Sequence, residues 1–288
     1  AVSPDGKLAV VSNYGGRGRP GSSLTVLDLE TGNIQKNISL GNFQRPHGSV
    51  FLKDGKHVLV TAEAQKALLL VNVESDSIEM VVKTNQNVSH MVETDPGQRF
   101  AFVSNIGSGS VCIIDLSKGE LIKTINTGEG AEGIACSPEG KELWVGNRAD
   151  DKISIIDIES LAVIENLECG SFPIRIKFTP DGKHALVSNA RSGEVAVFDV
   201  ELRKEVRRIS MNVTAVESKE GRLFGSQFEG SPIPVGILIP PDGKYAYVAN
   251  TNADIVTVID LRTWKIAKRL VAGREPDGLG YTPISIQQ

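Results

Sequence analysis

The stretch FTPDGKHALVSN, residues 178–189, decides the fold because near-copies of it recur along the whole chain. The copies are VSPDGKLAVVSN at 2–13, FLKDGKHVLVTA at 51–62, ETDPGQRFAFVSN at 93–105, CSPEGKELWVGN at 136–147 and IPPDGKYAYVAN at 239–250. We take the proline of each copy as its anchor. The anchors are Pro4, Lys53 (a substitution), Pro96, Pro138, Pro180, Pro241 and Pro283. An internal repeat of about 40–45 residues predicts an array of identical structural units.

Each repeat reads as four short strands. In the fifth repeat, the apolar run PIRIKF precedes the anchor, and a DG pair then marks a tight turn in which glycine tolerates positive φ. The runs HALVSN, EVAVFDV and EVRRIS follow as second, third and fourth strands, rich in Val and Ile. No segment has a helical period. Four-stranded repeats of this length predict an all-β propeller.

The segment PDGKYAYVANTNADIVTVIDLRTWKIAKRLVAG, residues 241–273, resembles the YVTN family of β-propeller repeats. A broader similarity is to lactonase-type and cytochrome-d1-type propellers, and it covers nearly the whole chain. The resemblance implies the fold, but the motif residues of this family belong to the scaffold, so activity must be argued from a site. It also implies export, because propellers of this type are commonly periplasmic or extracellular. The chain itself shows no signal peptide.

We expect a single propeller domain over residues 1–288. Six second strands can be counted, and the chain ends in a first strand that has no followers. The simplest closure lets a C-terminal strand at 276–283 complete the first blade, which gives six blades. The chain begins within a repeat, so we expect an upstream piece; if that piece supplies a further blade, there are seven.

The composition excludes several classes of function. The formal net charge is −4, which does not favour nucleic acid or an anionic membrane as partner. No apolar run is long enough to span a bilayer, so no transmembrane segment is predicted. The three cysteines form no CxxC pair, and no CxxCH haem attachment is present.

One face of the propeller, which we call the top, is predicted to carry function. It collects the start of each first strand and the ends of the second and fourth strands. Two insertions fall there, at 14–23 and within 211–233, and we expect the second to cover part of the top as a lid. Loops on a rigid scaffold are the usual place for binding residues.

The candidate site comes from one register of the repeat. Six residues before the successive anchors stand His47, His90, Glu132, Ile174, Val235 and Asp277. This position begins the first strand, which lines the central channel of a propeller. We therefore predict that His47, His90, Glu132 and Asp277 converge at the channel mouth. The next position holds Arg175, with glycines in most other repeats that we expect to give access.

Other top residues extend the predicted ligand site. Glu63 follows a second strand on this face, and Arg45 and Arg274 lie on top loops. Guanidinium groups bind carboxylates and phosphates in bidentate fashion, so a small anionic molecule or a protein partner is expected. Two imidazoles and two carboxylates also suit a divalent transition metal, with His47, His90, Glu132 and Asp277 as ligands. The alternative interpretation is that these positions are polar only because they face water in the channel.

Three functions fit these observations. The first is a binding propeller that holds a small ligand or protein partner at the top. The second is a metal-dependent hydrolase, lactonase or lyase that uses the His and carboxylate cluster for acid–base chemistry. The third is a structural repeat module of an envelope or surface protein. The family resemblance favours binding or structure, and the register of titratable residues favours an enzyme.

Overall fold

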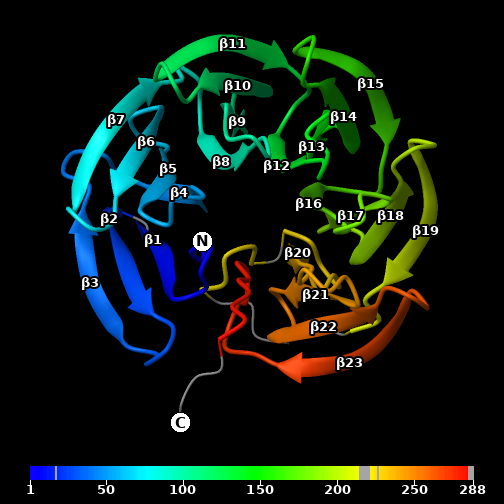
Figure 1. Ribbon diagram of the computed structural model, residues 1–288. Helices are drawn as coiled ribbons and strands as arrows, with labels where there is room; N and C mark the ends of the chain where they lie inside the picture. The colour runs from blue at the N-terminus through cyan, green and yellow to red at the C-terminus, as the bar shows by residue number, and fades with distance from the viewer. Residues whose placement is uncertain (17, 214–220, 226, 285–288) are drawn as a thin grey trace. The chain divides into compact units, whose positions relative to one another are not determined.

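The computed structural model describes residues 1–16, 18–213, 221–225 and 227–284. Within these residues the chain is all-β, with strands β1–β23 in six antiparallel sheets (Figure 1). Each sheet is one blade, and consecutive strands are neighbours in every sheet. The fold class expected from the repeat, a β-propeller with six blades, is confirmed.

By its internal contacts the chain divides into two compact units. The first comprises Ala1–Ala131 with Gly280–Gln288. Its strands are β1 (Leu8–Gly16), β2 (Arg19–Asp28) and β3 (Ile34–Ser39); β4 (Pro46–Phe51), β5 (His57–Ala62), β6 (Ala67–Asn72) and β7 (Ser77–Lys83); and β8 (Ser89–Thr94), β9 (Phe100–Asn105), β10 (Ser110–Asp115) and β11 (Glu120–Asn126).

The second unit comprises Glu132–Leu279 and holds the other three blades. Its strands are β12 (Ala131–Cys136), β13 (Glu142–Asn147), β14 (Lys152–Asp157) and β15 (Ala162–Glu168); β16 (Pro173–Phe178), β17 (His184–Asn189), β18 (Glu194–Asp199) and β19 (Lys204–Ser210); and β20 (Pro234–Leu238), β21 (Tyr245–Asn250), β22 (Ile255–Asp260) and β23 (Lys265–Val271).

The repeated PDG motif forms the turn between the first and second strands. In blade five, Gly182 adopts a φ of 70°, and its N–H donates to the carbonyl of Thr179 at 2.9 Å. The Asp181 carboxylate accepts from the Thr179 hydroxyl at 2.6 Å and from the Lys183 N–H at 3.1 Å. The Asp and Gly of the motif therefore each have a local hydrogen-bonding or backbone role, which explains why these residue types recur.

The core lies between neighbouring blades. In the second unit, Leu186, Val197, Val248 and Ile259 are fully buried in one cluster that joins blades five and six. Burial of a Leu or Ile side chain stabilises the fold by about 1.5–3 kcal/mol. Strands packed on both faces need apolar residues at successive positions, which accounts for runs such as β14 and β18.

The end of the chain differs from the expected closing strand at 276–283. The structure assigns no strand to residues 276–284, and residues 1–3 pair with β1 instead, through the antiparallel bridge Val2–Ala9. The N-terminal amine also donates to the carbonyl of Val10 at 2.9 Å. Thr282 contacts the same blade by donating to the Gly6 carbonyl at 2.7 Å. The innermost edge of β1 is thus already occupied, and the C-terminal segment joins the turn. The single-domain expectation stays a prediction.

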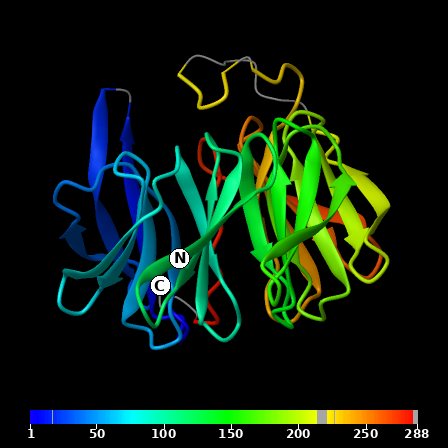
Figure 2. The ribbon, with the colours of Figure 1, turned by 90° about the horizontal axis from the view of Figure 1, so that it is seen from above.

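The insertion at 211–233 lies partly outside the described residues, because 214–220 and 226 are not described. Figure 2 shows its described residues, in yellow, beyond the strand ends of the second unit. Phe228 packs against Phe172 with ring centroids 4.7 Å apart, and Arg222 forms a bidentate pair with Asp254. Phe172 and Asp254 precede β16 and β22, on the loops that follow β15 and β21. The expectation of a lid stays a prediction.

Candidate functional site

Two registers of the repeat supply the candidate site residues. One is the predicted position six residues before each anchor. The other is the position ten residues after each anchor, directly after the Asn that ends most second strands. In that second register stand Tyr14, Glu63, Ile106, Arg148, Ala190 and Thr251. Of these residues, Glu63 was predicted from the sequence as a ligand-site residue, whereas Tyr14 was not identified. The shared offset from the anchor is the signal that identifies Tyr14.

A buried carboxylate organises the site in the first unit. Glu63, with its side chain 7% exposed, accepts the Tyr14 hydroxyl at 2.8 Å on Oε2. Its Oε1 lies 2.5 Å from Nδ1 of His90. The His47 ring stacks on the His90 ring, with centroids 3.5 Å apart and planes at 24°. Four side chains from three blades thus form one compact cluster, which we call the Glu63 cluster.

Arg45 extends the Glu63 cluster on one side. Its guanidinium carbon lies 5.2 Å from the centroid of the Tyr14 ring, within cation–π distance. Burial raises the pKa of Tyr14, and the hydrogen bond to Glu63 raises it further because the charged phenolate would face a carboxylate. Tyr14 is therefore a neutral hydrogen-bond donor at physiological pH, and it holds Glu63 in place.

The Glu63 cluster does not fit a metal shared by His47 and His90. A metal binds in the plane of an imidazole at about 2.0–2.1 Å from nitrogen. The two rings here are stacked, so their in-plane lone pairs run side by side instead of meeting at one point. Within the part of the chain that the structure describes, no group of three or more His, Cys, Asp or Glu side chains is placed to hold a metal ion.

The second unit carries a different cluster, built from these two registers and from Arg175, one position after the first register. Glu132, with its side chain 3% exposed, accepts from Arg148 on Oε2 and from Arg175 on Oε1, the latter at 2.7 Å. Burial works against the charge of Arg175, but the carboxylates of Glu132 and Asp277 outweigh it and raise the pKa of Arg175. We call this set the Glu132 cluster. Its buried carboxylate is neutralised by two guanidinium groups.

The remaining predicted residues of the second unit are more exposed. Asp277 is 37% exposed and lies 4.0 Å from Nη2 of Arg175. Arg274 is 58% exposed and pairs with Glu275 at 3.5 Å. The Arg148 guanidinium lies 4.9 Å from the Phe172 ring, which also contacts the insertion. Because His47 and His90 belong to the first unit, and Glu132 and Asp277 to the second, the convergence of all four stays a prediction.

Glycines beside the site residues have a packing role that was not expected. A Cβ on Gly48 would lie 2.6 Å from the His90 carbonyl oxygen, and one on Gly133 would lie 2.9 Å from the Arg175 Cα. One on Gly236 would lie 1.9 Å from the carbonyl oxygen of Asp277. The missing side chains let the backbone of the next inner segment approach closely. The expectation that these glycines give a ligand access is therefore replaced by close packing between blades.

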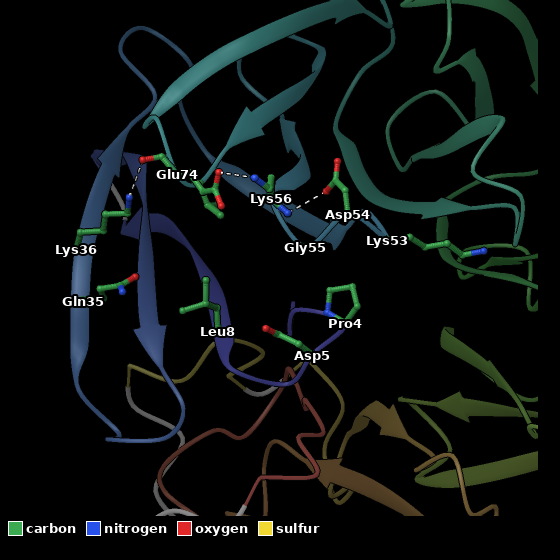
Figure 3. Close-up of a pocket in the computed structure, with 11 residues that line it drawn as sticks. Pro4, Asp5, Leu8, Gln35, Lys36, Lys53, Asp54, Gly55, Lys56 and Glu74 are labelled. Carbon is green, nitrogen blue, oxygen red and sulfur yellow. Dashed lines mark hydrogen bonds and ion pairs between the residues drawn. The ribbon is translucent and has the colours of Figure 1, made fainter.

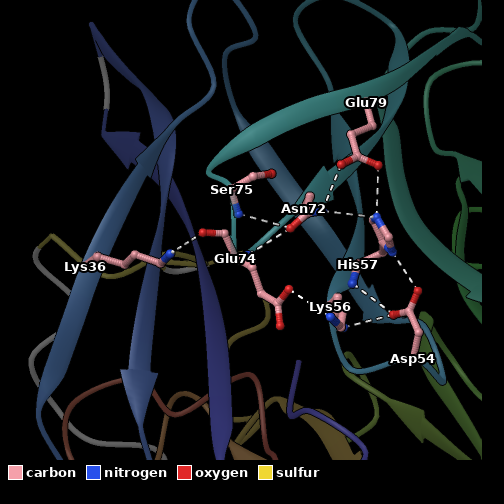
Figure 4. A network of polar contacts seen from close by, with 8 residues as sticks. All are labelled: Lys36, Asp54, Lys56, His57, Asn72, Glu74, Ser75 and Glu79. Atoms are coloured by element: carbon pink, nitrogen blue, oxygen red, sulfur yellow. Dashed lines mark hydrogen bonds and ion pairs between the residues drawn. The ribbon is translucent and has the colours of Figure 1, made fainter.

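The opposite edge of the first unit, where the PDG turns lie, carries a cavity and a histidine network. The cavity, of about 580 Å³, lies between the turns of blades one and two, and its lining includes Asp5 and Lys56 (Figure 3). Beside it, His57 is held between Asp54, at 2.6 Å, and Glu79, at 2.9 Å (Figure 4). The bond to Asp54 raises the pKa of His57, against a smaller effect of burial, and Glu79 adds to the rise.

Other groups offer little chemistry. All three cysteines are free, and burial raises the pKa of the Cys169 thiol to about 12, so it is protonated at neutral pH. Among the described residues, no helix is long and apolar enough to cross a membrane.

Comparisons with known proteins agree with the fold. No curated protein matches this chain. Among solved structures, the chain is similar to hydrazine synthase from Kuenenia stuttgartiensis, with a TM-score of 0.81 at 20% sequence identity, over 96% of this chain and 87% of that one. At this identity the likeness concerns the fold alone. The family model for YNCE-like beta-propellers matches residues 51–219, more than half of the sequence. The chain therefore belongs to the YNCE-like beta-propeller family.

Proposed function

We propose that the protein is a binding propeller that holds a small anionic ligand, or an acidic group of a protein partner, at the Glu63 cluster. The observation that carries the proposal is the buried Glu63 carboxylate shared by Tyr14 and His90, with His47 stacked behind it. The turns of the repeat do not need this arrangement, since Ile106 and Ala190 stand in the register of Glu63 in other blades.

The chemistry of the Glu63 cluster supports an anionic ligand. Glu63 contributes one negative charge, and Arg45 compensates it. Protonation of either imidazole then makes the cluster cationic. A bound carboxylate or phosphate favours that protonation, because an opposite charge within about 4–6 Å stabilises the charged imidazole.

The four histidines of the chain provide the test. His47 and His90 lie in the Glu63 cluster, whereas His57 and His184 begin second strands beside the PDG turns. Imidazole NMR resonances, assigned with single His→Gln variants, are followed during titration with acetate, succinate, inorganic phosphate and, as a neutral control, glucose. We expect an anion to shift the resonances of His47 and His90 and to leave those of His57 and His184 in place. Anions that move only His57 and His184, or no histidine at all, would overturn the proposal.

A second candidate function, acid–base catalysis, is favoured by the pairing of Glu63 with His90. The carboxylate holds Nδ1 of His90, so the tautomer with the proton on Nδ1 makes Nε2 the proton acceptor. In such a dyad the imidazole would take a proton from water attacking an ester or lactone, and the carboxylate would stabilise the imidazolium. The test is hydrolysis of simple lactones followed with a pH indicator. Glu63→Gln and His90→Gln should each lower the rate by about 10²–10⁴-fold, and His57→Gln should not change it.

Export to the periplasm or the cell exterior is part of the proposal and rests on the family resemblance. Fractionation of cells that express the full-length gene tests it. A structural role in an envelope or surface protein predicts that Glu63→Gln and His90→Gln leave every binding measurement unchanged.

A further inference from the structure

We propose that the second unit has a further ligand site, a groove beside Trp264 that binds an organic ammonium group. The groove lies at the PDG-turn edge, at the opposite ends of the strands from the Glu132 cluster. It forms a cavity of about 510 Å³ between the turns of blades five and six. This size is in the range of small-molecule sites. Its lining comprises Thr179, Pro180, Asp181, His184, Pro241, Asp242, Gly243, Leu261 and Trp264.

The aromatic part of the groove is half-buried. The rings of His184 and Trp264 meet edge to face, with centroids 5.0 Å apart and planes at 64°. Neither the indole N–H nor the imidazole nitrogens have a hydrogen-bond partner within the described part of the chain. The other tryptophan, Trp144, is fully buried, and its indole N–H donates to Glu142 at 2.8 Å. Trp264 thus presents an aromatic surface and a polar edge to a cavity.

The charges of the groove select a cation. Asp181 and Asp242 line it, and none of its lining residues is a lysine or an arginine. Outside the lining, the exposed Lys244 lies 3.6 Å from the Asp242 carboxylate. Hydrogen bonds from Thr179 and the Lys183 N–H, against a smaller effect of burial, lower the pKa of Asp181, so it is ionised at neutral pH. An ammonium group over an indole face is attracted by the ring quadrupole, and the two carboxylates add to this attraction.

The matching cavity of the first unit shows that the repeat alone does not produce this chemistry. It lies between the turns of blades one and two and is lined by three lysines and three carboxylates (Figure 3). Lys56 pairs with Glu74 at 3.0 Å, and Lys36 pairs with Asp76 at 2.6 Å. No aromatic residue lines it. The same place in the repeat therefore has balanced lining charges and no aromatic ring in one unit. In the other it has an aromatic pair and two lining carboxylates, of which only Asp242 has a nearby lysine, Lys244.

Tryptophan fluorescence tests the proposal directly, because Trp144 is buried and Trp264 reports the groove. The full chain is titrated with choline and with 3,3-dimethylbutan-1-ol, a neutral molecule of nearly the same shape. We expect a saturable change with choline at roughly millimolar concentration, and an affinity at least about tenfold weaker for the neutral molecule. Nα-acetyl-lysine-N-methylamide serves as a third ligand. If it binds more tightly than choline, the groove prefers a lysine side chain; if choline binds more tightly, the groove prefers a free quaternary ammonium compound.

Variants make the result specific. Trp264→Phe should remove the fluorescence response, and Asp181→Asn with Asp242→Asn should weaken choline binding about tenfold while keeping the acceptor oxygen of each turn. Asp5→Asn, in the corresponding turn of the first unit, should leave binding unchanged. The proposal is overturned by equal responses to choline and its neutral analogue, by a response that persists in Trp264→Phe, or by no saturation up to about 100 mM.

Discussion

The Glu63 cluster and the Glu132 cluster lie at neighbouring positions of the repeat but differ in the partners of a buried carboxylate. Glu132 is bound by Arg148 and Arg175, whose charges do not change between pH 5 and 9. Glu63 is bound by a phenol and an imidazole, and an imidazole, unlike a guanidinium, occurs in proteins in both a neutral and a charged form. Buried ion pairs need both partners, so the first arrangement fixes structure. The second can exchange a proton, and it is the better candidate for function.

Removal of the buried carboxylate should give the largest difference in stability loss between the two clusters. Glu132→Ala leaves Arg175, whose side chain is 15% exposed, with the Ile174 carbonyl and the distant Asp277 carboxylate, and we expect a loss of about 3–5 kcal/mol. The melting temperature should fall by roughly 10 °C in a calorimetric scan. Glu63→Ala leaves a neutral phenol and an imidazole without their acceptor, which costs about 1–3 kcal/mol. If Glu63→Ala proves the more damaging variant, the comparison fails.

Alanine at the packing glycines should disturb both clusters through the backbone. Gly236→Ala places a methyl group against the Asp277 carbonyl, and Gly48→Ala places one against that of His90, so each should cost about 1–3 kcal/mol. Gly278→Ala is the matched control, because nothing lies within 4 Å of its added Cβ. Thermal unfolding of the three variants is the measurement, and Gly48→Ala should also move the His90 resonance. Equal melting temperatures in all three would refute close packing.

His57 should show how a histidine behaves when it serves structure alone. Its pKa is raised in the folded protein by Asp54 first and then by Glu79. The stabilisation is therefore fully present below its unfolded pKa of about 6.5 and is lost as the pH rises through the folded value. His57→Gln should lower the melting temperature by about 2 °C at pH 5.5 and by less at pH 9. A larger effect at pH 9 would contradict this sign.

Metal addition should have the smallest effect. A metal that binds only the folded state raises the melting temperature. Because the rings of His47 and His90 are stacked, we expect Zn²⁺ or Ni²⁺ at ten times the protein concentration to leave it unchanged within about 1 °C. Elemental analysis of the protein and of the variant carrying His47→Ala and His90→Ala should show equal metal content. Stoichiometric metal that disappears in the variant would restore the metal interpretation.

Much of the fold was predictable because the repeated residues have local structural roles in each blade. The turn of Thr179, Asp181 and Gly182 uses each side chain in a local hydrogen bond or a positive φ, so its copies mark every blade. The closing strand at 276–283 was predicted from strand content alone, without asking which segment reaches β1 first. Residues 1–3 directly precede the turn that leads into β1, so they fold back and pair with this strand locally.

The candidate site was only partly predictable. The register of His47 and His90 was visible in the sequence, and the structure stacks these rings. The partners of the carboxylates were not visible, since Tyr14 reaches Glu63 from another blade and Arg175 reaches Glu132 from the next one. Such contacts depend on how closely inner strands approach, which sequence spacing within one repeat does not state.

The glycine that follows the site position in several blades suggests how the binding specificity of such a protein could be changed. This glycine lets the backbones of neighbouring inner strands approach closely, so the spacing between them does not depend on the side chain before it. In this one chain that preceding residue is His47, Glu132 or Val235 on the same scaffold. A protein engineer could therefore substitute the side chain at this position in one blade at a time to change what the surface binds, provided that the following glycine is kept.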